Sequence, residues 1–277
     1  MNVLNFACWS AMAAVSFLAA PVWAQKAVPQ KSSVPRAADG KPDLTGVWQP
    51  GSTIRGSWEA ANSGTGVGGS GKDPSAPVAP SSTDRQGEGA PYQAWAARKV
   101  LESFNSRDLD DPTARCLPAG IPRLVSFGLF PMQIVQTPQQ IIMLYEYMNV
   151  FRVIPLNGKH PDDAEPTYLG DSVAHWEGDT LVVDVTRFND KTWLIGGGTF
   201  HSEDFHVTER YTRVDKDQIN YEAVMEDPKV LTKPWVYRTT MMLREGTRVR
   251  EYVCAENNLD VERYEKMLKD GVKFGRQ

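Results

Sequence analysis

The sequence contains few of the residues and none of the motifs that mark the common cofactor-dependent enzymes. It has 3 Cys and 4 His among 277 residues. It lacks a Gly-rich phosphate loop, an HExxH motif, a GxSxG motif and an EF-hand loop. A lone run of glycines at residues 196–198 leads into no βαβ unit. We therefore expect neither a cofactor nor a bound metal.

An excess of charge of one sign is also missing. The 30 Lys and Arg side chains nearly balance the 34 Asp and Glu side chains, and the formal net charge is −4. This balance argues against nucleic acid as the main partner, and it offers no attraction to an anionic membrane surface. With 41% hydrophobic residues, the chain has the composition of a globular protein rather than of a disordered one.

Beyond the first 24 residues, no hydrophobic run is long enough to cross a membrane. Residues 1–24 carry no charged side chain, and their apolar core at 11–20 falls well short of the roughly 20 residues that a spanning helix needs. Residues 22–24 (VWA) have the small-x-small pattern of a signal peptidase site. We predict a cleaved signal peptide over 1–24, a periplasmic or secreted mature chain and no transmembrane segment.

Removal of that leader would leave two of the three cysteines. Cys8 lies within it, whereas Cys116 and Cys254 belong to the mature chain. An even pair in an oxidising compartment is a disulfide candidate. The alternative is two unpaired, buried thiols. Without a CxxC motif, two such distant cysteines form neither a redox motif nor a zinc site by themselves.

Composition divides the mature chain into a tether, a disordered loop and one folded domain. Residues 25–41 are polar and contain proline, which predicts a flexible tether. Residues 62–91 are rich in Gly, Ser, Ala and Pro, and they cannot bury enough apolar surface to offset the entropy of ordering. We therefore predict a single β-barrel domain over 42–277 that includes a disordered loop at 62–91.

The folded region is predicted to be mainly β. Short runs rich in β-branched and aromatic residues alternate with turn sequences such as EGD and DKD. Joins this short pair successive strands antiparallel. We predict an antiparallel meander closed into a lipocalin-like barrel, or a two-sheet sandwich. Two short peripheral helices are expected at 92–105 and 260–270. Strands are expected at 42–48, 124–129, 132–136, 140–147, 150–155, 173–176, 180–186, 205–214, 218–226, 235–243 and 247–254.

Several of these segments resemble one group of secreted bacterial proteins. The shared motifs are PDLTGVW at 42–48, CLPAGIPR at 116–123, HWEGDTLVVD at 175–184 and an EDP..PW pattern at 226–235. They occur in the same order and span most of the mature chain. The resemblance implies export and a β-rich fold, but the family is largely uncharacterised and transfers no catalytic residue. At 254–258 the sequence reads CAENN, where the family pattern has a Cys-His-Glu-type run.

Glu209 is the first candidate catalytic residue. Side chains alternate faces along a strand, which sets Glu209 beside Tyr211 on the apolar face of the strand expected at 205–214. Burial there would raise its pKa and suit the carboxyl to general acid–base catalysis. The alternative is an ion pair with an Arg of a neighbouring strand, such as Arg238 or Arg250.

The opposite face of the same strand combines His206 with Arg210. An imidazole that moves a proton beside a guanidinium that stabilises negative charge suits acid–base catalysis. On an outward face, the two side chains would simply meet solvent. His201 lies at the start of this stretch, where it could reach a pocket together with Asp204, and metal binding there is a further alternative.

Glu146 is the second candidate carboxylate. It follows the apolar run 141–145. If it shared a lumen with Glu209, the two carboxyl groups could act as an acid–base pair. Otherwise it is a charged residue at a strand end beside Arg152.

Aromatic residues are spread over the β region, where they either fill the core or line a ligand cavity. The candidate substrate-binding residues are Trp193, Trp176, Tyr145 and Tyr237. Trp193 lies in a long connection, where a Trp has fewer structural reasons to occur. Residues 189–193 are therefore predicted to form a lid over a pocket.

Together these features predict an exported β-barrel that binds a small apolar or aromatic organic molecule. If the protein is an enzyme, the expected chemistry is cofactor-free acid–base work by a lyase, isomerase, cyclase or hydrolase. The alternatives are a non-catalytic periplasmic carrier and a structural envelope protein. The sequence leaves the substrate, the reaction class and the oligomeric state open.

Overall fold

The computed structural model describes residues 34–50, 90–105, 111–126, 129–195, 198–256 and 258–271. The predicted signal peptide, most of the predicted tether and nearly all of the predicted disordered loop lie outside the described residues. Within the described ranges, no helix is long and apolar enough to cross a membrane.

The described chain is mainly β, as predicted, and both predicted peripheral helices are present. The strands are β1 (Gly46–Pro50), β2 (Met132–Gln136), β3 (Gln140–Tyr145), β4 (Val150–Pro155), β5 (Asp171–Glu177), β6 (Thr180–Thr186), β7 (His206–Arg213), β8 (Gln218–Glu226) and β9 (Trp235–Leu243). The α-helices are α2 (Ala94–Asn105), α3 (Arg123–Ser126) and α4 (Asp260–Lys269), and the 3₁₀ helices are η1 (Pro112–Arg115) and η2 (Tyr147–Asn149).

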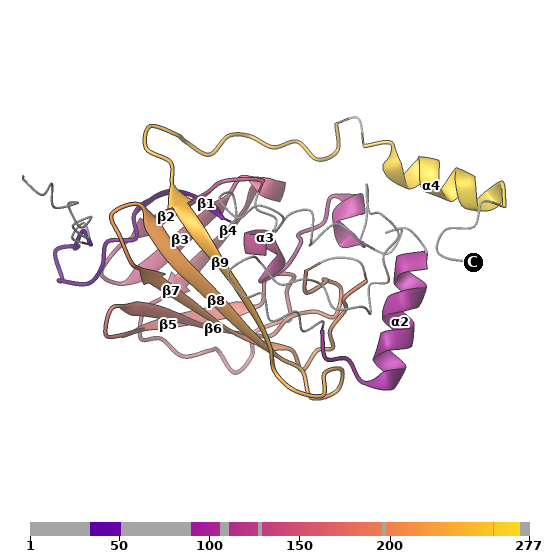
Figure 1. Cartoon of the computed structure of the whole chain (residues 1–277), viewed down its shortest axis with the longest axis horizontal. Coiled ribbons are helices and arrows are strands. Elements are labelled where there is room, and N and C mark those ends of the chain that lie inside the picture. Colours follow the sequence, from indigo (N-terminus) through magenta and orange to yellow (C-terminus); the bar gives the residue numbers. More distant parts are fainter. Residues whose placement is uncertain are drawn as a thin grey trace, which may run out of the picture. The chain divides into compact units, whose positions relative to one another are not determined.

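All nine strands form one continuous sheet that curls into a nearly closed barrel (Figure 1). Their order is β4-β3-β2-β1-β9-β8-β7-β6-β5, and every neighbouring pair is antiparallel. The first strand closes the meander, because β1 pairs with both β2 and β9. The fold is thus the predicted up-and-down barrel of lipocalin-like type rather than a two-sheet sandwich.

The barrel has one seam, which lies between β4 and β5. Nine is an odd number, so the two outermost strands of an all-antiparallel order run in the same direction. Among the described residues a single parallel bridge, between Leu156 and Ala174, joins them. Parallel neighbours cannot be joined by a hairpin. The connection 156–170 therefore returns along the barrel before β5 begins.

Side-chain alternation packs the barrel interior. Along β7, every second residue is buried, from Val207 through Glu209 and Tyr211 to Arg213. Strands β3 and β8 show the same period of two, as a half-buried strand requires. The largest fully buried side chains of the described core are Trp48, Tyr211, Tyr221, Phe188, Phe205, Leu44, Ile121, Met132, Ile134, Ile141, Met143 and Ile154.

The strand predicted at 124–129 is wrong, because residues 123–126 form the short helix α3. The helix begins directly after the Ile121–Pro122 peptide, where Leu124 N donates to Gly120 O at 3.0 Å. Leu124 and Val125 are both buried. A short apolar run buried on all sides has no period that separates a strand from a helix.

The strand predicted at 247–254 is also wrong. Its backbone groups pair with side chains instead of a neighbouring strand. Arg250 N donates to Glu146 Oε2 at 2.9 Å, and Tyr252 N donates to Asn149 Oδ1 at 3.1 Å. These contacts satisfy the polar backbone atoms, and they attach the segment after β9 to the turn between β3 and β4.

The candidate disulfide is present in the structure. Cys116, directly after η1, is bonded to Cys254, and the two residues are 138 positions apart in the sequence. Asn258 strengthens the same attachment, because its Nδ2 donates to Ala114 O at 2.8 Å. The bond therefore ties the segment after β9 to the segment before α3.

We predict that Cys116→Ser/Cys254→Ser lowers the free energy of unfolding by about 2–5 kcal/mol, because the reduced chain gains the entropy of a long open loop. Urea denaturation of the wild type and the double variant measures the loss. Dithiothreitol should lower the wild-type midpoint to that of the variant and leave the variant unchanged. Equal stability of the two proteins would contradict a stabilising bond.

Candidate functional site

One ion pair is buried inside the barrel. Arg152 of β4 and Glu209 of β7 meet there, with Arg152 Nη2 lying 2.6 Å from Glu209 Oε2, and their side chains are 3% and 0% exposed. The contact is electrostatic, since Oε2 has no hydrogen-bond partner among the described residues. Glu209 thus lies on the apolar face, but its partner is Arg152 rather than the predicted Arg238 or Arg250.

Three tyrosines surround this ion pair. Tyr211 and Tyr221 both donate to Glu209 Oε1, at 2.8 and 2.9 Å. Tyr145 Oη accepts from Arg152 Nη1 at 3.4 Å. Burial, together with the charge of Glu209, raises the pKa of Tyr211 and Tyr221 well above the ordinary value. Both hydroxyls therefore stay protonated and serve as donors.

Arg152 also connects the lumen to the seam. Its Nη2 donates to Ser172 Oγ of β5 at 2.8 Å. Burial lowers the pKa of Arg152, but Glu209 and the tyrosines outweigh that effect, and the net shift is upward. Nε is buried and has no hydrogen-bond partner among the described residues. A buried donor left unpaired costs about 1–3 kcal/mol, so this atom is a place where an acceptor would be stabilised.

A groove with a volume of about 340 Å³ opens at the seam beside Arg152. We call it the seam groove. One wall is β4 and the other is the chain leading into β5. It is lined by Pro118, Phe151, Arg152, Val153, Thr167, Tyr168, Leu169, Gly170, Asp171 and Ser172.

Gly170 allows the second wall to pack closely on β6. Its φ of +68° is one that side chains rarely adopt, and a Cβ there would lie 2.6 Å from Thr186 O. Thr167 N donates to Arg187 O at 3.0 Å, which attaches the same wall to the chain after β6. The wall is therefore held by backbone contacts that depend on glycine.

The usual arrangement of apolar and charged side chains is inverted on β4. Arg152 is buried, whereas Phe151 is 64% exposed and Val153 is 47% exposed. Both apolar side chains line the seam groove. Exposed apolar surface that continues into a hollow is typical of a binding site.

A second polar network crosses the outer surface of the barrel. His206 contacts Asp184 Oδ1 through Nε2 at 2.5 Å and Glu226 Oε2 through Nδ1 at 3.2 Å. His160 contacts Asp184 Oδ2 through Nε2 at 2.8 Å and Asp171 Oδ2 through Nδ1 at 2.5 Å. We call these five residues the His–carboxylate chain. It ends at the seam groove, because Asp171 lines the groove.

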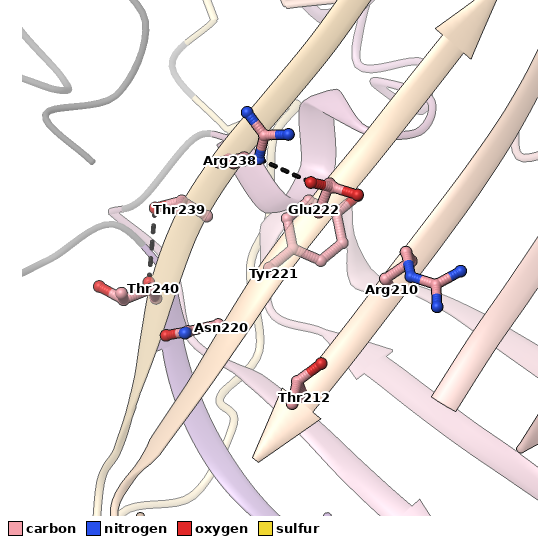
Figure 2. A pocket seen from close by; sticks show the side chains of 8 residues that line it. All are labelled: Arg210, Thr212, Asn220, Tyr221, Glu222, Arg238, Thr239 and Thr240. Atoms are coloured by element: carbon pink, nitrogen blue, oxygen red, sulfur yellow. Dashed lines mark hydrogen bonds and ion pairs between the residues drawn. The ribbon is translucent and has the colours of Figure 1, made fainter. Parts of the chain in front are cut away.

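Arg210 lies on the same outer face as His206, as the alternation implies, but has its own partner. Its Nη2 is 2.5 Å from Glu177 Oε2. Arg210 also lines a hollow of about 380 Å³ on β7, β8 and β9 (Figure 2). There Arg238 Nε donates to Glu222 Oε2 at 2.6 Å, and Arg210 points away from that pair. Both guanidinium groups of this hollow are thus already paired with carboxylates.

His201 is buried and does not join Asp204. Its Nδ1 donates to Ser202 O at 2.9 Å, and Nε2 accepts from Thr192 Oγ1 at 2.6 Å. Burial lowers its pKa and keeps the ring neutral. Asp204 pairs with Lys229 at 2.9 Å instead. Among the described residues, no group of three His, Cys, Asp or Glu is placed to hold a metal ion.

The candidate substrate-binding aromatic residues pack against the hydrophobic core. Trp193, Tyr145 and Tyr237 are buried members of it, and Trp176 is partly buried against it. Trp193 also lies beside Arg123, whose guanidinium is 5.6 Å from the ring centre. None of the four lines the seam groove.

Glu146 belongs to a structural contact. It lies between the end of β3 and the start of η2, and its Oε2 accepts from Arg250 N at 2.9 Å. Arg152, its expected neighbour, is paired with Glu209. Glu146 thus helps to attach the segment after β9 to the barrel.

The sequence analysis missed Arg152, Ser172, Asp171 and His160. In β4 (VFRVIP) nearly every position is apolar, so no alternation shows which face Arg152 occupies. Asp171 and His160 come from different parts of the β4–β5 region, and only the return of the connection 156–170 brings them together. One signal was present, since Glu209 on an apolar face required a cationic partner.

We predict that removing one member of the buried ion pair costs more stability than removing both. Arg152→Met leaves Glu209 charged and uncompensated, Glu209→Gln does the same to Arg152, and each change should cost about 3–5 kcal/mol. The double variant should lose less stability than either single variant, as urea denaturation of all four proteins would show. Additive losses would mean that the two side chains do not interact.

Comparison with known proteins identifies no family for the chain. No protein-family model and no curated protein match it. Among solved structures, it resembles a mutant of the fluorescent protein UnaG with a TM-score of 0.26 and 13% identity, over 49% of this chain and 86% of that one. A TM-score this low does not establish a shared fold.

Proposed function

We propose that this protein binds a small, largely apolar or aromatic molecule in the seam groove, with an acceptor atom of the ligand placed against Arg152. The observation that carries this proposal is Arg152 itself, which lines the groove, is 4% exposed and keeps Nε without a partner among the described residues. A ligand oxygen that reached Nε would satisfy this buried donor.

The walls of the groove support an apolar ligand of modest size. Phe151 and Val153 are exposed on one side, and Tyr168 and Leu169 line the other. A volume of about 340 Å³ lies at the small end of the range of roughly 300–1,000 Å³ for ligand pockets. A substituted bicyclic aromatic compound fits this description.

Charge around the groove favours a neutral acceptor over a carboxylate. Arg152 already faces Glu209 at 2.6 Å, so these two charges compensate each other. Asp171 adds a further carboxylate to the lining, and His160 contacts it at 2.5 Å. An anionic ligand would have to compete with Glu209 for the guanidinium. A ketone, aldehyde or ester needs only the N–H donor of Arg152 and no uncompensated positive charge.

Cofactor-free acid–base turnover of the same ligand is a second candidate function. The observation that favours it is the presence of Asp171 and Arg152 in one groove. Arg152 would stabilise negative charge that develops on a carbonyl oxygen, and Asp171 would accept a proton from the adjacent carbon. Such a lyase, isomerase, cyclase or hydrolase would lose turnover in Asp171→Asn by a much larger factor than it loses binding.

We also propose that the protein works after export, in the periplasm or outside the cell. The disulfide between Cys116 and Cys254 supports this location, because such bonds persist mainly in oxidising compartments. The leader-like residues 1–24 support it independently.

Prodan, a neutral naphthalene ketone whose emission shifts to the blue in apolar surroundings, tests the proposed site. We expect saturable binding of prodan that Phe151→Ala weakens roughly tenfold, because the lost apolar contact is worth about 1–2 kcal/mol. The corresponding carboxylate, 6-(dimethylamino)-2-naphthoate, should bind more weakly than prodan. Fluorescence titration measures all of these affinities.

Leu129→Ala is the matched control for this experiment. Leu129 is 54% exposed, similar to Phe151, and does not line the seam groove. Its removal should leave the dissociation constant for prodan unchanged. Equal affinity of prodan for the wild type and both variants would refute the site, and tighter binding of the naphthoate would refute the neutral acceptor.

A further inference from the structure

The His–carboxylate chain alternates two imidazole rings with three carboxylates. In order, it consists of Glu226, His206, Asp184, His160 and Asp171, and each of its four contacts measures between 2.5 and 3.2 Å. Every ring nitrogen faces a carboxylate oxygen. Within the described residues, no other His has both ring nitrogens placed against carboxylates.

This geometry matches imidazole rings that donate through both nitrogens, because each of the four ring nitrogens faces a carboxylate oxygen. A neutral imidazole donates through one nitrogen and presents a lone pair on the other. In His160 and in His206, such a lone pair would point at a negatively charged oxygen. Only the imidazolium form donates through both nitrogens, and then each ring bridges two carboxylates with charge-assisted hydrogen bonds.

The chain joins the barrel wall to the seam groove. Glu226, His206 and Asp184 belong to β8, β7 and β6. His160 belongs to the connection 156–170, and Asp171 begins β5 and lines the groove. His160 therefore holds the connection and the groove wall against β6 through Asp184.

We propose that this chain makes ligand binding in the seam groove depend on pH, with protonated His206 completing the contacts that hold the groove wall in place through Asp184 and His160, and with deprotonation of His206 weakening that attachment. The inference rests on the proposed function, since it concerns regulation of the same site. Its physical basis is a local conformational equilibrium that the protonation of His206 shifts.

The charged groups that face these rings are all carboxylates. Asp171 of β5 and Asp184 of β6 face His160, and Asp184 and Glu226 of β8 face His206. On its own connection, His160 is followed by Asp162 and Asp163 and preceded by Lys159. Arg187 Nη2 donates to the backbone oxygen of Asp162 at 3.2 Å, which is an additional anchor without a titrating acceptor.

The direction of the pH effect follows from the two shifted groups. The hydrogen bond to Asp184 raises the pKa of His206 above its ordinary value of 6.5. The chain is therefore complete below pH 6.5, the ordinary pKa of histidine, and it weakens as the pH rises through the raised pKa of His206. The hydrogen bond to His206 lowers the pKa of Asp184 below its ordinary value of 3.8, so acid breaks the Asp184 contacts only below that range. Binding is strongest between these limits.

The experiment is a prodan titration of the whole mature protein from pH 5 to pH 9. Prodan carries no group that titrates over this range. We expect the dissociation constant to rise roughly fivefold or more as His206 loses its proton, a modest coupling between sites. In His160→Gln/His206→Gln the affinity should be low and nearly independent of pH.

His175→Gln is the matched control. His175 lies on β5, as Asp171 does, and contacts only Glu177 of its own strand, at 3.2 Å. Its removal leaves the described contacts of the connection 156–170 intact, so this variant should keep the wild-type pH profile. A flat wild-type profile, or a profile lost in the control as well, would overturn the proposal.

Amide hydrogen exchange of residues 157–171 separates this proposal from the proposed function. Corrected for the intrinsic pH dependence of exchange, protection of this segment should fall as the pH rises through the raised pKa of His206 in the wild type and stay low in His160→Gln/His206→Gln. If prodan fails to bind but this pattern is seen, the seam groove is refuted as its site while the pH-dependent attachment stands. Unchanged protection refutes the attachment itself.

Discussion

The barrel depends on one buried ion pair, because no backbone ladder closes its seam. An odd number of strands in an antiparallel order leaves β4 and β5 parallel, and one bridge between Leu156 and Ala174 joins them in the described chain. Side-chain contacts join the strands at the seam, where a ladder of backbone hydrogen bonds is missing. Arg152 reaches across the seam to Ser172 and across the lumen to Glu209.

The same arginine gives the protein its candidate binding site. A buried ion pair rarely adds net stability over an apolar replacement of the same shape. Its specific contribution here is orientation, since Arg152 must point inward to meet Glu209, and Phe151 and Val153 must then point outward. The apolar surface that results lies beside an incompletely satisfied guanidinium. The inward orientation of Arg152 thus produces both the exposed apolar surface and the incompletely paired guanidinium of the seam groove.

Electrostatic interactions on the two faces of the barrel differ in kind. Inside, Tyr211 and Tyr221 stay hydrogen-bond donors to Glu209 around neutral pH, because burial raises their pKa values well above the ordinary value. Outside, the His–carboxylate chain is partly exposed and contains His206. The ordinary pKa of histidine lies near neutrality, and the pKa of His206 is raised above it. The inner network therefore maintains the geometry of Arg152, whereas the outer one can respond to pH. Both converge on the wall formed by Asp171 and Ser172.

The sequence by itself determined the local structure. Turn residues and the period of two predicted all nine strands of the described chain to within four residues and placed Glu209 and Tyr211 on the apolar face of β7, and the cysteine count made Cys116 and Cys254 a candidate pair. These features follow from neighbouring residues or from simple counting. An apolar run without a period indicates neither the type of element, as at α3, nor the face that a residue occupies, as in β4.

Only the tertiary structure decided which distant groups meet. The partner of Glu209, the face of Arg152 and the meeting of His160 with Asp171 and Asp184 depend on where the sheet leaves its seam and how the connection 156–170 returns along it. The physical reason is that strand pairing sets these positions through the register of the whole barrel. A charge in the sequence shows that a partner is needed, but the closure of the fold selects which one it meets.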